Sequence, residues 1–293
     1  MSKLQVLITG STGFIGQHFI KAYVGHYNLR VVNLRTEAIE ILNLAGVDTV
    51  LHLAALVHQM QGAPAPQYFN VNHNLTMTLA RKAKADGVGH FIYMSTTHVY
   101  GHYGNMQNPS ERLNENSACE PTDAYGQSKL LAEENLRRLE DKNFKISIVR
   151  SPLVYGPGGK GNLNALTKLI SVFPFLPFRY PTNRRSLIYI ENLVYFLHLL
   201  IQQRKSGLFL PQDIEPISIQ SLVELVATSA NKNVYLFSMP KFIFKILYLL
   251  RPTVVQRLYG TFALDSTTTN LEIGYTPIYS TKDGLKATIQ AEH

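Results

Sequence analysis

Leu4-Gln-Val-Leu-Ile-Thr-Gly10-Ser-Thr-Gly13-Phe-Ile-Gly16 is a short apolar run that leads directly into three evenly spaced glycines. This order predicts a strand, a tight turn and the start of a helix. In such a turn the first glycine permits the bend, the middle one lets backbone N–H groups approach a pyrophosphate, and the last lets the helix pack on the sheet. The residues predicted to bind a dinucleotide here are Gly10, Thr12, Gly13, Phe14, Ile15 and Gly16.

Strand-like and helix-like segments alternate through the first half of the chain. The strand-like segments are continuous apolar runs, which is typical of a parallel sheet covered on both faces. We expect strands at residues 4–9, 29–34, 49–53, 91–95 and 146–150, and helices at 13–24, 36–44, 69–84 and 124–139. The alternation predicts an α/β fold with a Rossmann-type, doubly wound parallel sheet.

The alternation ends near Pro152, and a region rich in proline and aromatic residues follows, including Phe173-Pro-Phe-Leu-Pro-Phe-Arg-Tyr-Pro181. A strand at 186–190 and a helix at 191–201 are expected to return to the sheet. We therefore predict two units. They are a dinucleotide-binding domain of residues 1–152 plus 186–204, and a smaller mixed α/β substrate-binding lobe of residues 153–185 plus 205–293.

The composition is that of a globular enzyme. Of 293 residues, 45% are hydrophobic and 16% are charged, and the net charge is +8. No run of five like charges occurs, so small anionic substrates explain the positive charge better than nucleic acid does. The single cysteine, Cys119, cannot form an internal disulfide and fits a reducing compartment. With no apparent signal peptide, we expect a cytoplasmic protein.

Two kinds of chemistry lack a sequence signature. The ten histidines and one cysteine show no metal-ligand spacing, so no metal site is predicted. No Gly-x-Ser-x-Gly stretch occurs either, so a hydrolase triad has no nucleophile to build on.

The segment Lys241-Phe-Ile-Phe-Lys-Ile-Leu-Tyr-Leu-Leu250 has two interpretations. It is either a basic amphipathic helix on a membrane surface or a core helix of the smaller lobe whose lysines extend to solvent. Two lysines make a weak polar face, so we favour the core helix. The segment is too short to span a bilayer. Peripheral contact with a membrane surface therefore remains the only membrane-related alternative for it.

Tyr125 and Lys129 lie one helical turn apart in the segment Ala124-Tyr-Gly-Gln-Ser-Lys129. A tyrosine with the ordinary pKa of about 10 is a poor acid or base near neutrality, and a cation on the same helix face favours its ionised form. Thr96 follows an expected strand and could hold a substrate oxygen in line with the phenol. Together with the glycine turn, these three residues predict hydride transfer coupled to proton transfer, with Thr96, Tyr125 and Lys129 as catalytic residues.

Arg35 stands at the expected end of the second strand, nineteen residues beyond Gly16. An acidic residue at this point binds the adenosine ribose 2′-hydroxyl of NAD, whereas an arginine accommodates the 2′-phosphate of NADP. We therefore predict a preference for NADP(H) over NAD(H), while NAD(H) and a solvated surface arginine remain the alternatives.

These motifs together resemble those of the extended short-chain dehydrogenases/reductases, the family of UDP-galactose 4-epimerase and dTDP-glucose 4,6-dehydratase. The resemblance covers nearly the whole chain and includes His52-Leu-Ala-Ala55, Val99-Tyr-Gly101 and Arg150-Ser-Pro-Leu-Val-Tyr-Gly156. It implies a role in the cofactor site for Leu53, Ala54, Ala55, Asn72, Tyr125, Lys129 and Pro152. It implies substrate contacts for Thr97, Asn162 and Arg185, with Arg185 at the diphosphate of a UDP-sugar, and homodimers through helices 69–84 and 124–139.

Departures from the family pattern narrow the expected activity. The dehydratases have Asp-Glu directly after the catalytic threonine, whereas this chain has Thr97-His98, which argues against 4,6-dehydration. The 4-epimerases have asparagine where this chain has Leu153. A closer resemblance is to bacterial capsule and lipopolysaccharide enzymes that reduce UDP-2-acetamido-2,6-dideoxy-hexos-4-uloses, and these share the short second connection and Arg35. His58 could contact the substrate or only fill space.

The function expected from the sequence is therefore NADPH-dependent reduction of a 4-keto UDP-sugar. The alternatives are a nucleotide-sugar 4-epimerase with tightly held NAD and a non-catalytic nucleotide-sugar or NADP sensor. The sensor is disfavoured because Tyr125 and Lys129 are both present.

Overall fold

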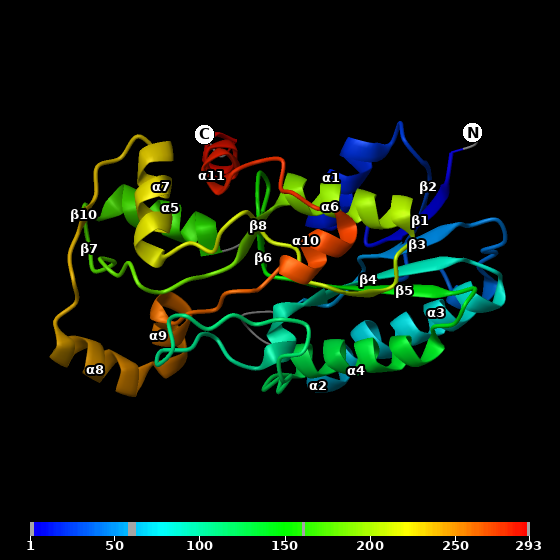
Figure 1. Ribbon diagram of the computed structural model, residues 1–293, viewed down its shortest axis with the longest axis horizontal. Helices are drawn as coiled ribbons and strands as arrows, with labels where there is room; N and C mark the ends of the chain where they lie inside the picture. The colour runs from blue at the N-terminus through cyan, green and yellow to red at the C-terminus, as the bar shows by residue number, and fades with distance from the viewer. Residues whose placement is uncertain (1–2, 58–62, 160–161, 292–293) are drawn as a thin grey trace.

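A computed structural model describes residues 3–57, 63–159 and 162–291 (Figure 1). A sheet of six parallel strands occupies one half of the molecule, with strand order β2-β1-β3-β4-β5-β9. Its strands are β1 Gln5–Thr9, β2 Asn28–Val32, β3 Thr49–His52, β4 His90–Thr96, β5 Lys145–Ser151 and β9 Gly207–Phe209. This confirms the predicted doubly wound parallel sheet.

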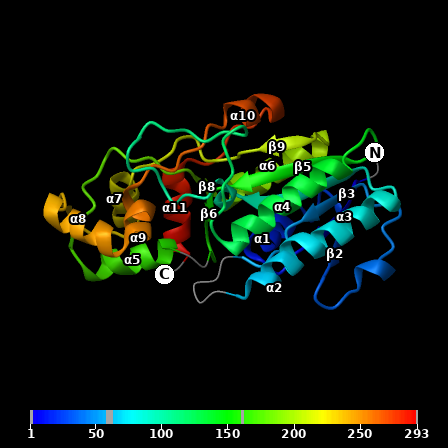
Figure 2. The ribbon, with the colours of Figure 1, turned by 90° about the horizontal axis from the view of Figure 1, so that it is seen from below.

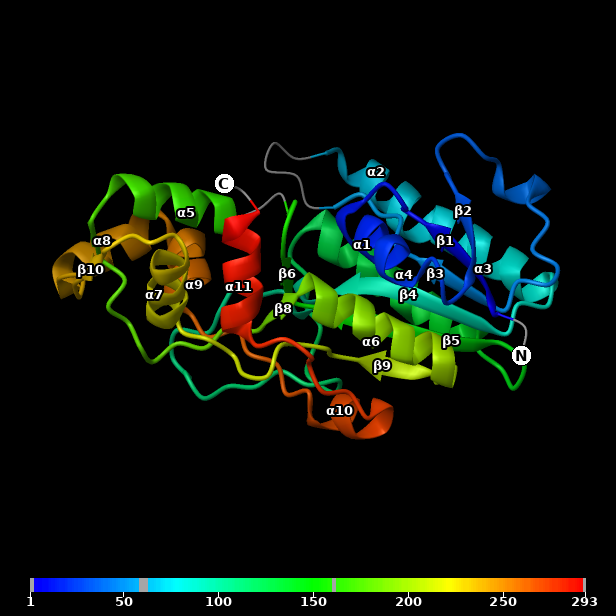
Figure 3. The ribbon, with the colours of Figure 1, turned by 90° about the horizontal axis from the view of Figure 1, so that it is seen from above.

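Helices cover both faces of the sheet (Figures 1 and 3). One face carries α1 Phe14–Tyr23 and α6 Ile190–Gln203, and the other carries α3 Thr76–Ala85 and α4 Ala124–Leu139. Successive side chains of a strand point to opposite faces. Accordingly, Val6 and Ile8 join the core beneath α1 and α6, whereas Leu7 joins the core beneath α3 and α4.

The second half of the molecule is built mainly of helices (Figure 2). It contains short two-stranded pairs, β6 Leu153–Tyr155 with β8 Leu187–Tyr189 and β7 Phe175–Leu176 with β10 Tyr235–Leu236. Its helices are α5 Asn162–Val172, α7 Ile219–Ser229, α8 Lys241–Leu250, α9 Pro252–Tyr259 and α11 Thr281–Gln290. A further helix, α10 Thr267–Ile273, packs on α6.

Two expected elements differ from the structure. Residues 36–44 form only a 3₁₀ turn, η1 Ile39–Ile41, because this short connection has little sheet surface to cover and β2 is an edge strand. The strand expected at 186–190 forms as β8, but it pairs with β6 instead of the main sheet. The sixth sheet strand is β9, from a segment that the sequence assigned to the lobe. The two-unit division stays a proposal, with β9 moved to the first unit.

Helix α8 is not a core helix. None of its residues is buried, so the interpretation favoured from the sequence was wrong. The sequence could not show this, because two lysines among eight apolar residues suit both a helix that is enclosed by a domain and one that rests on it by one side. None of the helices in the described residues is long and apolar enough to cross a membrane.

Candidate active site

The glycine turn joins β1 to α1 at the carboxyl edge of the sheet. Gly10 has a φ of +73°, and a Cβ atom there would lie 2.6 Å from the backbone nitrogen of Ala54. A Cβ on Gly16 would lie 2.4 Å from the carbonyl oxygen of Gly10. Both glycines are therefore required by backbone-to-backbone packing. The positive φ of Gly10 fits the predicted tight turn, whereas Gly16 lies against the backbone of the turn itself, not against the sheet as the sequence predicted.

The first turn of α1 is open to an anion. Gly13 is the N-cap residue, and no side chain caps the helix. Uncapped N–H groups at a helix N-terminus, together with the helix dipole, favour bound phosphate. Thr12 is exposed beside them, while Phe14 and Ile15 are half-buried in the first turn. The cradle therefore fits the pyrophosphate of a dinucleotide.

His52, the last residue of β3, connects the end of β1 to α3 beside this cradle. Its Nδ1 lies 2.7 Å from the Thr9 hydroxyl, and its Nε2 lies 2.8 Å from the Thr76 hydroxyl. Burial lowers the pKa of His52 to about 3, so the ring is neutral. Ala54 donates its N–H to the Thr9 hydroxyl at 3.3 Å. This buried contact links β1, the loop after β3 and α3.

Asn72 connects the loop Leu53–Leu56 to helix α4. It lies in a π-helical turn, η2 Asn70–Leu75, a distortion often found at functional sites. Its Oδ1 accepts the Leu56 N–H at 2.8 Å, and its Nδ2 donates to the Leu56 carbonyl and to the Ser128 hydroxyl. The side chain therefore acts in this structure by positioning the loop that carries Leu53, Ala54 and Ala55.

The three expected catalytic residues converge where β4 ends and α4 begins. Asp123 caps α4 by accepting the N–H of Gly126 at 2.7 Å, which starts the helix one residue before Tyr125. Thr96 is the last residue of β4. Burial raises the pKa of Tyr125 to about 12, and hydrogen bonding with the Thr96 side chain opposes the rise. The phenol is therefore protonated near neutral pH.

Lys129 is a buried residue of α4. Its ammonium donates to the Met94 carbonyl at 2.8 Å and lies 4.6 Å from the centre of the Tyr93 ring. Burial lowers the pKa of Lys129 to about 7, and the charge of Glu133 opposes this shift. The sequence interpretation gave Lys129 the role of favouring the ionised Tyr125, whereas in the structure Thr96 is the neighbour that lowers the pKa of the phenol.

A buried ion pair supports this helix and was missed in the sequence. Glu133 lies one turn beyond Lys129. Its carboxylate accepts hydrogen bonds from two nitrogens of Arg150 at 2.7 and 3.1 Å, and also one from the Ser95 hydroxyl. Both charged side chains are almost fully buried. The spacing 125, 129, 133 on one helix face was visible, but nothing in the sequence showed that Arg150 would be opposite.

Arg185 lies in the second lobe, where its guanidinium donates to the carbonyls of Tyr103 and Gly260 at 3.1 and 3.2 Å. Burial, and to a lesser extent the neighbouring Arg257, lower the pKa of Arg185 to about 10. Arg257 in turn lies 4.2 Å from the Tyr103 ring. Arg185 and Arg257 thus lie beside the same tyrosine, and we call this pair the cationic corner. A bound anion would stabilise it. The sequence had indicated Arg185 but not Arg257.

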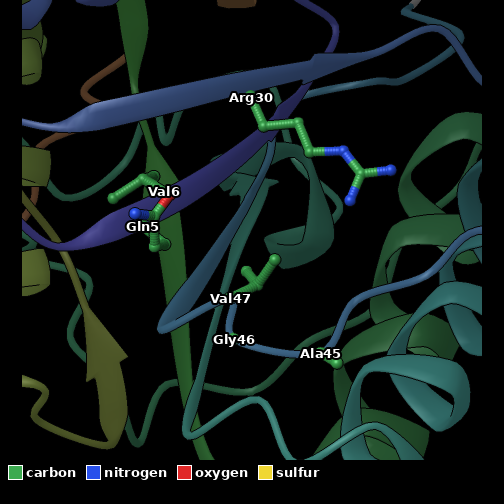
Figure 4. Close-up of a pocket in the computed structure, with 6 residues that line it drawn as sticks. All are labelled: Gln5, Val6, Arg30, Ala45, Gly46 and Val47. Carbon is green, nitrogen blue, oxygen red and sulfur yellow. The ribbon is translucent and has the colours of Figure 1, made fainter.

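The remaining predicted residues are placed as follows. Thr97 and Pro152 are buried after β4 and β5, and Arg35 is exposed in the turn after β2. Asn162 begins α5, but its side chain is outside the described residues, as is His58. A pocket lined by Gln5, Val6, Arg30, Ala45, Gly46 and Val47 lies at the amino edge of the sheet (Figure 4). It is therefore at the opposite edge from the site.

A Rossmann-type sheet, a phosphate cradle and a half-buried tyrosine one helical turn before a buried lysine are typical of the nicotinamide-dependent class of enzymes. Residues 6–209 match the NAD dependent epimerase/dehydratase family, and the chain belongs to that family. It is 32% identical to a UDP-glucose 4-epimerase of Vibrio cholerae, in an alignment that covers 98% of this chain and 94% of the relative.

Two further relatives extend this comparison. An N-acetyl-alpha-D-glucosaminyl-diphospho-ditrans,octacis-undecaprenol 4-epimerase of Escherichia coli O157:H7 is 27% identical, covering 98% of this chain and 95% of the relative. Among solved structures, the UDP-N-acetylglucosamine 4-epimerase of Methanobrevibacter ruminantium M1 has a TM-score of 0.77 at 19% identity, covering 100% of this chain and 99% of the other. This last likeness supports the fold.

Proposed function

We propose that the protein transfers hydride at C4 of the sugar of a nucleotide sugar, in the direction of 4-keto reduction with NADPH. The proposed substrate is a UDP-2-acetamido-2,6-dideoxy-hexos-4-ulose, and the product is a sugar of the UDP-FucNAc or UDP-QuiNAc type. The observation that carries the proposal is the placement of Thr96, Tyr125 and Lys129 at the sheet edge that also holds the glycine turn.

The chain's own residues supply the proton chemistry. Tyr125, whose phenol is protonated near neutral pH, donates its proton to the sugar oxygen as the ketone is reduced. Thr96 orients that oxygen beside the phenol. Lys129, whose pKa is lowered to about 7, can supply a proton to the site near neutral pH. The glycine turn and the loop Leu53–Ala55 would hold the dinucleotide, whose nicotinamide supplies the hydride when bound.

The second candidate is 4-epimerisation, the activity by which two of the relatives aligned over nearly their whole length are named. It uses the same residues but needs oxidation first, so Tyr125 would have to start as a base. We place the reductase first because this chain has Leu153 where the 4-epimerases have asparagine, and Arg35 after the second strand.

Cofactor use separates the two candidates. A reductase is expected to consume about one equivalent of NADPH per 4-keto sugar, followed as loss of absorbance, with the product identified by NMR. An epimerase is expected to purify with bound NAD and to interconvert 4-hydroxy epimers without added cofactor. The reductase would be excluded if the protein interconverted 4-hydroxy epimers without added cofactor and consumed no NADPH with any UDP-4-keto sugar.

Arg35 is proposed to bind the 2′-phosphate of NADP. Its side chain is exposed, while its backbone N–H is held by Asn33 at 3.1 Å, so the turn is formed without the guanidinium. Arg35→Ala is expected to weaken NADPH binding by roughly tenfold or more, the loss of a charge-assisted contact, and to leave NADH binding unchanged. Arg30→Ala, which removes an exposed cation from the preceding strand β2, is the control. Unchanged affinity for both cofactors would contradict this role.

The cationic corner of Arg185 and Arg257 is proposed to receive the substrate diphosphate, and Thr97 and Asn162 are kept as proposed substrate contacts. The homodimer through residues 69–84 and 124–139 also remains a prediction, as does a cytoplasmic location.

A further inference from the structure

The far end of the second lobe carries an unusually apolar and basic surface. Helix α8 lies at the end of the molecule most distant from the six-stranded sheet (Figures 1 and 3). Phe242, Ile243, Ile246, Leu249 and Leu250 are exposed by 43–81%. Soluble monomers rarely leave so many large apolar side chains together on one element.

The exposed residues form one face of the helix. Phe244 and Leu247 are half-buried, and the Phe244 ring packs edge-on against Tyr259 of α9 at 5.2 Å. At about 100° per residue, positions 242, 246 and 249 lie opposite those two anchors. The helix thus rests on the lobe by one side and presents an apolar stripe outward. Lys241 and Lys245 lie along one border of that stripe.

Charge identifies what this face would meet. No Asp or Glu occurs from Leu225 to Leu264 or from Pro152 to Ile190, the segments that contain β7, β10, α8 and α9. The first of these segments contains Lys232, Lys241, Lys245, Arg251 and Arg257. A second copy of the chain would bring the same positive charges into contact, whereas an anionic lipid surface would neutralise them.

Aromatic residues next to α8 fit the same partner. Phe175 of β7 and Tyr235 of β10 stack at 5.4 Å, and both are exposed, as is Phe237. These strands lie at the same end of the lobe as α8 (Figure 1). Amphipathic aromatic rings are enriched at membrane–water interfaces.

We propose that α8, with the neighbouring edge of β7 and β10, docks the protein on an anionic phospholipid surface. The helix would lie in the plane of the interface with Phe242, Ile246 and Leu249 among the acyl chains and its lysines at the headgroups. This proposal does not depend on the activity proposed above, because it concerns a surface at the opposite end of the molecule from the sheet.

Vesicle sedimentation tests the proposal on the full chain. We expect the protein to sediment with vesicles of phosphatidylcholine and phosphatidylglycerol, more weakly with phosphatidylcholine alone, and less as salt rises. The double variant Phe242→Ser, Leu249→Ser should lower the partition coefficient at least tenfold, because two large apolar side chains are lost. Lys241→Gln and Lys245→Gln should each lower it by roughly fivefold on anionic vesicles only.

The control is Leu271→Ser, which removes a similarly exposed leucine from α10. It should bind vesicles like the unmodified protein, and all variants should keep the same melting temperature. Failure of the unmodified protein to sediment with anionic vesicles would overturn the proposal, as would equal binding by the double variant. A dimer in sedimentation velocity that the double variant dissociates would assign the face to a second copy instead.

Discussion

Replacing Tyr125 by phenylalanine is expected to lower turnover by about 10²–10⁴-fold, the usual contribution of a general acid. The substitution removes one hydroxyl and keeps the ring, which packs edge-on against His98 at 5.5 Å and beside Tyr68 at 6.1 Å. The fold and the cofactor cradle should therefore be unaffected. Turnover is measured with a 4-keto sugar and NADPH, and cofactor affinity by titration of the nicotinamide fluorescence.

A matched control separates the acid from a general effect of losing a tyrosine hydroxyl. Tyr235→Phe makes the same change on an exposed residue of β10 and should retain full turnover. If Tyr125→Phe kept turnover within a few-fold of the unmodified protein, Tyr125 would not be the proton donor and the proposed mechanism would fail.

The largest expected effect on stability is that of Glu133→Ala. Glu133 and Arg150 are buried together, so removing the carboxylate leaves the guanidinium charged and without its partner. Breaking a buried pair in this way costs about 3–5 kcal/mol, which should lower the melting temperature by roughly 10 °C. The charge of Glu133 also raises the pKa of Lys129, so any residual activity should show a shifted pH profile.

Two further variants test the cause of that loss. Glu134→Ala changes the next residue, which is exposed on the same helix, and should shift the melting temperature by little. Glu133→Ala combined with Arg150→Met removes both charges and should recover part of the loss. A stability of Glu133→Ala equal to that of Glu134→Ala would show that the buried pair does not hold the helix.

The sequence predicted the elements whose pattern is local. The helix at 124–139 forms with the expected bounds because an Asp cap, helix-forming residues and a buried face agree. The glycine turn likewise follows from backbone geometry that only glycine tolerates. The prediction of a helix at 36–44 was wrong, because periodicity alone does not show whether the sheet offers a surface on which the apolar side of the helix could pack.

The amino-acid sequence by itself predicted the parallel sheet, the glycine turn and the spacing of Tyr125 and Lys129, since the patterns that indicate each element are local. Only the tertiary structure decided which charges meet. It placed Arg150 against Glu133, Arg257 beside Arg185, and Thr96 as the neighbour that lowers the pKa of Tyr125. It also left α8 exposed. The physical reason is that burial and electrostatic pairing depend on distances between distant segments, which no local spacing specifies.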